Sequence, residues 1–128
     1  MENERYEKGL KKLNERDDKA GEQVIADLKN IAPDLGRYII EFVFGDIYCR
    51  DVLSLQEREI ITITSLLTAG GCEPQLEVHI NASLNVGIQP EKIIETFIQC
   101  VPYVGFPKVL NAVNVAKKVF AERNILLF

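Results

Sequence analysis

The chain has 128 residues, 47% of them hydrophobic and 27% charged, which suits one domain, and we expect residues 1–128 to form a single domain. Its net charge of −4 comes with no basic stripe, so a nucleic-acid-binding protein is not expected. The opening residues form no apolar stretch, and no run of about 18 apolar residues occurs, so we expect neither a signal peptide nor a membrane-spanning helix.

The apolar residues recur with helical spacing throughout, which predicts a compact all-α bundle of about six to seven helices. Residues 1–19 are rich in charge and predict a first helix that is exposed or packed against a partner. A second helix is predicted over residues 22–31, and Pro33 is suited to the first turn of a third. This third helix carries an apolar stripe at Leu35, Ile39, Phe42 and Val43.

The second half of the chain predicts four further helices. Ser54 and Glu57 have the S-x-x-E spacing of a capping box, so a fourth helix begins at Ser54, and the glycine pair at residues 70–71 ends it. This helix is apolar almost all round, which is typical of a central helix. The sixth helix is expected to break at Pro102 and Gly105. The last three helices are opened by Pro74, Pro90 and Pro107.

Three cysteines, Cys49, Cys72 and Cys100, occur in the chain, and no two of them form a C-x-x-C pair. An odd number without paired spacing argues against a disulfide framework and favours a reducing, cytoplasmic location. One histidine and three scattered cysteines also lack the spacing of a structural zinc site, so no metal is expected. Cys72 lies just before the fifth helix, where a thiol can become reactive, although a role as a small, partly buried hydrophobic residue is favoured.

His79 is the one histidine of the chain and shares a face of the fifth helix with apolar residues. Histidine exchanges protons near neutral pH, so His79 is a candidate catalytic acid or base. Glu59 lies in the predicted central helix and needs a partner there, because an unpaired buried charge is costly. In the functional interpretation Glu59 orients His79, while Arg58 binds an anionic substrate. In the structural interpretation, which the residues alone favour, His79 is a hydrogen-bonded core residue and the charged residues only begin a helix.

Three segments resemble the carboxymuconolactone decarboxylase family. They read L-S-L-Q-E-R-E-I at residues 53–60, H-I-N-A-S-L-N-V-G-I-Q-P-E-K-I-I-E at 79–95, and Y-V-G-F-P-K-V-L-N-A at 103–112, so the family core runs over residues 53–119. The resemblance implies an all-α fold shared with alkylhydroperoxidase D, assembled as a homotrimer or homohexamer. The number of apolar residues, which is large for so small a domain, fits burial against other subunits and a well-packed monomer about equally.

The resemblance implies one of two activities. In the decarboxylase branch an enzyme without a cofactor removes CO2 from a small anionic lactone. For this branch the resemblance implies that His79 delivers a proton, that Glu59 sets the protonation state of His79, and that Arg58 binds a carboxylate. In the peroxidase branch a C-x-x-C precedes the histidine, but here Cys72 matches the first cysteine and Gln75 stands at the second. The decarboxylase is therefore the leading hypothesis, while a thiol-dependent peroxidase of peroxiredoxin type using Cys72 and a non-enzymatic oligomeric binder of small molecules stay open.

Overall fold

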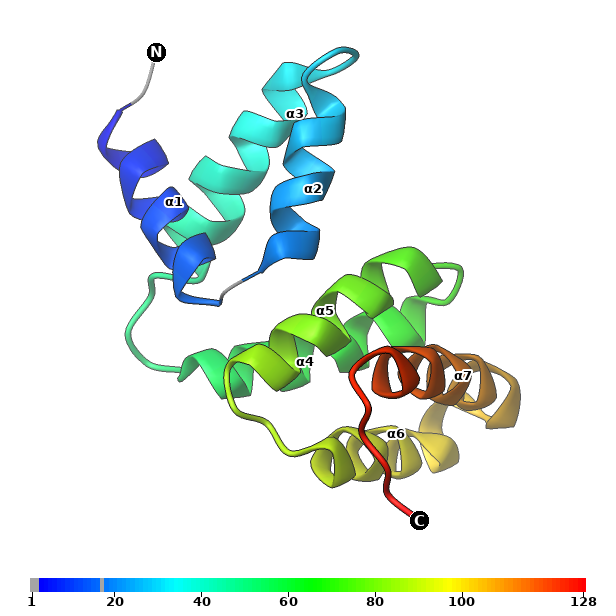
Figure 1. The fold of residues 1–128 in the computed structure, drawn as a ribbon. Coiled ribbons are helices and arrows are strands. Elements are labelled where there is room, and N and C mark those ends of the chain that lie inside the picture. The colour runs from blue at the N-terminus through cyan, green and yellow to red at the C-terminus, as the bar shows by residue number, and fades with distance from the viewer. Residues whose placement is uncertain (1–2, 17) are drawn as a thin grey trace. The chain divides into compact units, whose positions relative to one another are not determined.

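The computed structural model describes residues 3–16 and 18–128 and divides the chain into two compact units, Met1–Leu55 and Gln56–Phe128. Within the described residues every regular element is helical, with seven α-helices and one π-helix, which confirms the predicted all-α fold (Figure 1). That residues 1–128 form a single domain stays a prediction. No helix in the described part of the chain is long and apolar enough to cross a membrane.

The first unit contains four helical segments, of which Figure 1 labels α1, α2 and α3. They are α1 (Glu4–Glu15), α2 (Lys19–Leu28), α3 (Pro33–Tyr38) and the π-helix η1 (Ile39–Ile47). The most extensive contact of the unit is between α1 and η1. Its small core holds Leu13, Phe44 and Tyr48. The guanidinium carbon of Arg16 lies 4.7 Å from the Phe44 ring centre and 5.3 Å from the Tyr48 ring centre, so this buried cation packs on two aromatic faces.

Helix α2 begins earlier than the predicted start at Glu22. The reason is a helix cap, because Asp18 Oδ1 accepts a hydrogen bond from the Gly21 backbone N–H at 2.7 Å. The first helix is shorter than the predicted range of residues 1–19, and residues 1, 2 and 17 of that range lie outside the described residues.

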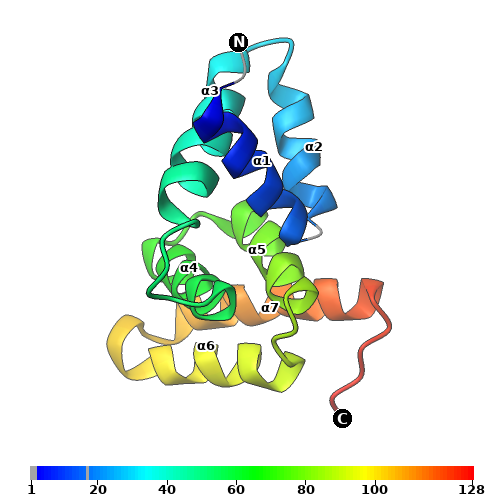
Figure 2. The same cartoon turned by 90° about the vertical axis from the view of Figure 1, so that its left-hand side faces the viewer.

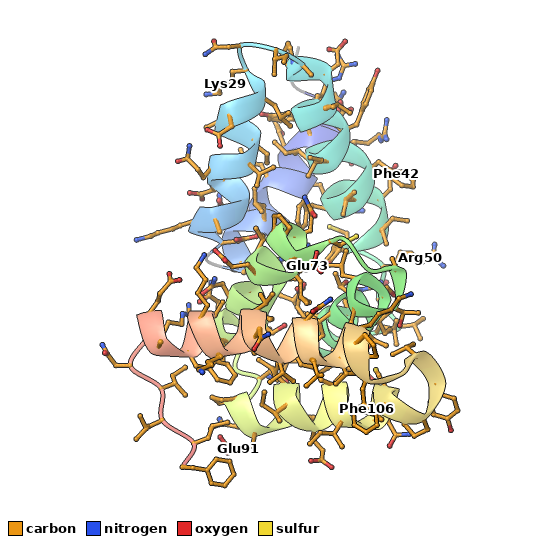
Figure 3. The ribbon with its side chains drawn as sticks, turned by 90° about the vertical axis from the view of Figure 1, so that its right-hand side faces the viewer. Lys29, Phe42, Arg50, Glu73, Glu91 and Phe106 are labelled. Carbon is orange, nitrogen blue, oxygen red and sulfur yellow. The ribbon has the colours of Figure 1, made fainter. Side chains whose placement is uncertain are left out.

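The apolar stripe predicted for the third helix is only partly buried. Leu35 and Phe42 are 52% and 55% exposed, whereas Ile40 and Phe44 are buried. For Phe42 the π-helix η1 explains the difference, because its wider turns rotate the side chains away from the 3.6-residue spacing of an α-helix. In Figure 3 the labelled Phe42 extends from the outer side of η1.

The second unit packs four helices, which Figure 2 labels α4 to α7, around one apolar core. They are α4 (Leu55–Ala69), α5 (Glu73–Asn85), α6 (Pro90–Val104) and α7 (Phe106–Glu122). Helix α7 contacts both α5 and α6. All four helices contribute to the core, which includes Ile63, Leu67, Leu76, Ile80, Ile93, Phe97, Val109 and Ala116.

Glycines end α4 and α6 of the second unit, and a proline does not. The glycines at residues 70–71 follow α4 with φ of 73° and 70°, a backbone conformation that glycine adopts without strain. The break predicted at Pro102 is wrong, because α6 continues through it to Val104 and ends at Gly105, whose φ is 88°. Pro102 is exposed in the last turn of α6, where a missing N–H removes one hydrogen bond near a helix end.

Candidate functional site

Helices α4 and α5 bring Glu59 and His79 together. Nδ1 of His79 lies 3.0 Å from Oε1 of Glu59. The Glu59 side chain is fully buried, whereas the His79 side chain keeps 20% of its surface exposed. When Glu59 is ionised its carboxylate can only accept, and Nδ1 then carries the hydrogen and donates it to Oε1. The contact fixes the imidazole and turns Nε2, its second nitrogen, away from Glu59.

The buried position of Glu59 follows from its place on α4. It shares the inner face of the helix with Ile63 and Leu67, at positions i, i+4 and i+8, and is buried with them. A carboxylate at that depth requires a hydrogen-bonding partner, because removing a charge from water costs several kcal/mol. His79 supplies such a partner from α5. The pairing proposed in the functional interpretation is therefore present as a contact, while the catalytic roles of both residues stay predictions.

Arg58 leaves α4 from a neighbouring face. Consecutive residues of an α-helix point about 100° apart, so the Arg58 side chain diverges from that of Glu59. Arg58 is half-buried, and its backbone carbonyl accepts a hydrogen bond from the Thr62 hydroxyl at 2.8 Å. Its predicted role in binding an anionic substrate stays a prediction.

Cys72 lies at the start of α5 and is half-buried. Its thiol donates a hydrogen bond to the Gly70 carbonyl at 3.4 Å. It lines a cavity of about 20 Å³, which has room for a single water-sized molecule. His79 follows seven residues later, which places it roughly 10 Å further along the helix axis. The helix therefore separates Cys72 from the His79–Glu59 pair, and its predicted redox role stays a prediction.

The three cysteines are free thiols that we expect to differ in reactivity. Burial raises the pKa of the Cys100 thiol, and a hydrogen bond with Thr64 offsets part of this effect. Because the thiolate is the reactive form, Cys100 should react with iodoacetamide at about pH 8 at least roughly tenfold more slowly than Cys49 or Cys72. Mass spectrometry of the alkylated peptides measures each rate. In denaturant the three rates should converge, and equal rates in the folded protein would contradict the expectation.

Two polar residues that the sequence analysis did not single out make hydrogen bonds on α4 and α5, and one of them joins the two helices. The Gln56 carboxamide donates to the Val86 carbonyl at 2.8 Å and joins the start of α4 to the end of α5. The buried Ser83 hydroxyl donates to the backbone carbonyl of His79 at 2.7 Å, one turn along the same helix. The sequence gives no indication of either hydrogen bond, because glutamine and serine are common in helices whether or not they make such contacts.

The chain matches the carboxymuconolactone decarboxylase family over residues 33–118, which is more than half of its length. It therefore belongs to this family, and the predicted resemblance is confirmed. The match includes Arg58, Glu59, Cys72 and His79. At the level of the family, membership supports a decarboxylase-like function.

Three curated proteins are similar to the chain. A 4-carboxymuconolactone decarboxylase of Acinetobacter baylyi is 28% identical over 123 residues, which cover 95% of this chain and 91% of that protein. An uncharacterized 15.0 kDa protein in the nqo9-nqo10 intergenic region of Paracoccus denitrificans is 28% identical over 98 residues, covering 76% and 73% of the two chains. Peroxisomal protein 2 of Saccharomyces cerevisiae is 33% identical over 86 residues, which are 66% of this chain but 30% of that protein.

Proposed function

We propose that the protein is a cofactor-free decarboxylase that removes CO2 from a small carboxylated lactone such as 4-carboxymuconolactone. The observation that carries the proposal is the partly exposed His79 imidazole, which a fully buried Glu59 carboxylate contacts at 3.0 Å. A histidine held in this way is suited to proton transfer near neutral pH. The substrate class is supported by similarity over 95% of the chain to a protein named 4-carboxymuconolactone decarboxylase.

The reaction asks three things of the protein. Loss of CO2 breaks a carbon–carbon bond, and the electron pair passes through the ring double bond onto the lactone carbonyl oxygen. The protein must hold the anionic substrate, stabilise the charge on that oxygen and deliver a proton to carbon. In the proposal, Arg58 binds a substrate carboxylate, and His79 acts as the imidazolium, with a hydrogen on each nitrogen, and delivers the proton from Nε2. Glu59 accepts the hydrogen bond from Nδ1 and keeps the ring in one orientation.

We further propose that the protein acts as a homotrimer or homohexamer in the cytoplasm. Three free cysteines suit a reducing compartment. Large exposed apolar side chains are available for contacts between subunits, and Figure 3 labels one of them, Phe106, where α6 passes into α7. The large apolar residues exposed on the helices include Leu35, Tyr38, Phe42, Ile98, Tyr103, Phe106 and Leu110.

Incubating the purified protein with 4-carboxymuconolactone tests the proposed reaction. We expect the ultraviolet absorbance of the substrate to fall while CO2 is released in equal amount. Heat-denatured protein serves as the control and gives the uncatalysed rate. Release no faster than this control would overturn the proposed substrate class. Hydroperoxide reduction by the wild type and by Cys72→Ser would then test the thiol-peroxidase alternative.

A further inference from the structure

We propose that Gln75 donates the hydrogen bond that stabilises the enolate oxygen of the substrate. The inference rests on the proposed decarboxylase function, in which no residue has yet been assigned to this oxygen. Arg58 is placed on a substrate carboxylate, and His79 is placed on the carbon that receives the proton. The lactone carbonyl oxygen therefore requires a further donor, because negative charge develops on it as CO2 leaves.

Gln75 lies on α5 one turn before His79. Residues four apart share a face of a helix, and helical side chains lean toward the N-terminus, so the His79 imidazole lies over the turn that contains Gln75. The other side chain of that turn on this face, Leu76, is 3% exposed and belongs to the core. Gln75 is exposed. A ligand at the exposed edge of His79 therefore meets the Gln75 carboxamide on this turn.

The Gln75 carboxamide makes no hydrogen bond within the part of the chain that the structure describes. Two other glutamines are engaged, since Gln56 donates to a backbone carbonyl at 2.8 Å and Gln23 donates to a carboxylate at 2.7 Å. A carboxamide has two N–H donors, and those of Gln75 can bind a ligand without first breaking an internal contact. This distinguishes Gln75 from the glutamine that joins α4 to α5.

A neutral donor suits the chemistry at this oxygen. The charge on the oxygen exists only after the carbon–carbon bond breaks and CO2 leaves, so a donor placed there favours the transition state over the ground state. When the proton from His79 Nε2 adds to carbon, the electron pair returns and the oxygen becomes a carbonyl again. His79 then recovers its proton from water. The Gln75 N–H donates throughout and is not consumed.

Substitution of Gln75 by leucine tests the inference, because leucine keeps a similar size and removes both N–H donors. We expect Gln75→Leu to lower kcat by roughly 10²–10³-fold while KM stays within about threefold of the wild type. Gln75→Glu should lower kcat further, because a carboxylate repels the enolate. Gln99→Leu, at an exposed glutamine of α6, is the matched control and should retain wild-type kinetics. Circular dichroism and thermal unfolding should be unchanged in all three variants.

The outcomes separate this inference from the proposed function. If the wild type turns over and Gln75→Leu keeps its kcat, the role of Gln75 is overturned and the decarboxylase proposal stands. A rise in KM alone would also overturn it, because it would place Gln75 on the ground-state substrate. If the wild type releases no CO2, the proposed function fails and this inference fails with it.

Discussion

Decarboxylation of 4-carboxymuconolactone by the His79→Gln variant should fall by roughly 10²–10⁴-fold in kcat, because glutamine cannot deliver a proton. Glutamine is suited to this test, since its amide N–H can replace Nδ1–H as the donor to Glu59, which lies 3.0 Å from the imidazole in the wild type. The buried carboxylate keeps a partner, and the fold is expected to persist. Substrate absorbance and CO2 release measure kcat, and circular dichroism measures the fold.

Two further variants separate proton delivery from a general effect of mutation. Glu59→Gln should lose less activity than His79→Gln, because the variant keeps His79 as the proton donor. Some activity is lost because the glutamine amide can either accept from or donate to Nδ1, so it no longer fixes the hydrogen on that nitrogen. Lys117→Gln, on the exposed side of α7, should match the wild type. Full activity of folded His79→Gln protein would remove His79 from the mechanism and leave its contact with Glu59 as a structural one.

The start and end of several helices could be predicted because local backbone chemistry sets them. Proline has no N–H to satisfy and is suited to the first turn of a helix, and α6 begins at the predicted Pro90. Helix α7 begins one residue before the predicted Pro107. The glycines at residues 70–71 adopt the positive φ that ends α4. These signals involve only neighbouring residues, so a single sequence contains them.

The inner face of α4 could not be predicted in the same way. The sequence suggested a central helix, apolar almost all round, yet Ile61 is 50% exposed while the charged Glu59 is fully buried. Which face is buried depends on the helices that pack against it. The 3.0 Å contact of Glu59 with His79 joins residues on two helices, so residue spacing alone left the structural interpretation favoured. The resemblance to a family indicated that Glu59 and His79 act together, and the structure brings these two side chains into contact.

The π-helix η1 escaped prediction for a related reason. Its sequence has the apolar spacing of an ordinary helix, and a π-helix depends on where its neighbours pack. Gly9 of α1 and Gly45 of η1 mark a close approach of the two backbones, since a Cβ on Gly45 would lie 2.7 Å from the Arg5 carbonyl oxygen. The absence of side chains at these two positions permits the packing that defines the first unit.

The Gly9→Ala substitution should destabilise the first unit by roughly 2–3 kcal/mol, because it inserts an atom into a closed backbone contact. A Cβ at Gly9 would lie 1.9 Å from the carbonyl oxygen of Ile40, and this oxygen belongs to the backbone of η1. No side-chain rotation relieves such an overlap, so α1 and η1 must separate. Alanine favours a helix over glycine by only about 1 kcal/mol, which is less than the expected loss.

Gly36→Ala is the matched control, since it makes the same change in α3 of the same unit. There the Cβ would lie 3.3 Å from Cγ2 of Ile25, the end of a side chain that can move, and we expect a change within about 1 kcal/mol. Urea unfolding gives the free energies, and amide hydrogen exchange in α1 and η1 assigns the loss to the first unit. Because both variants have the same composition, only the location of the added methyl group distinguishes them. Equal stability and equal protection of α1 would therefore mean that α1 and η1 do not approach as closely as these contacts require.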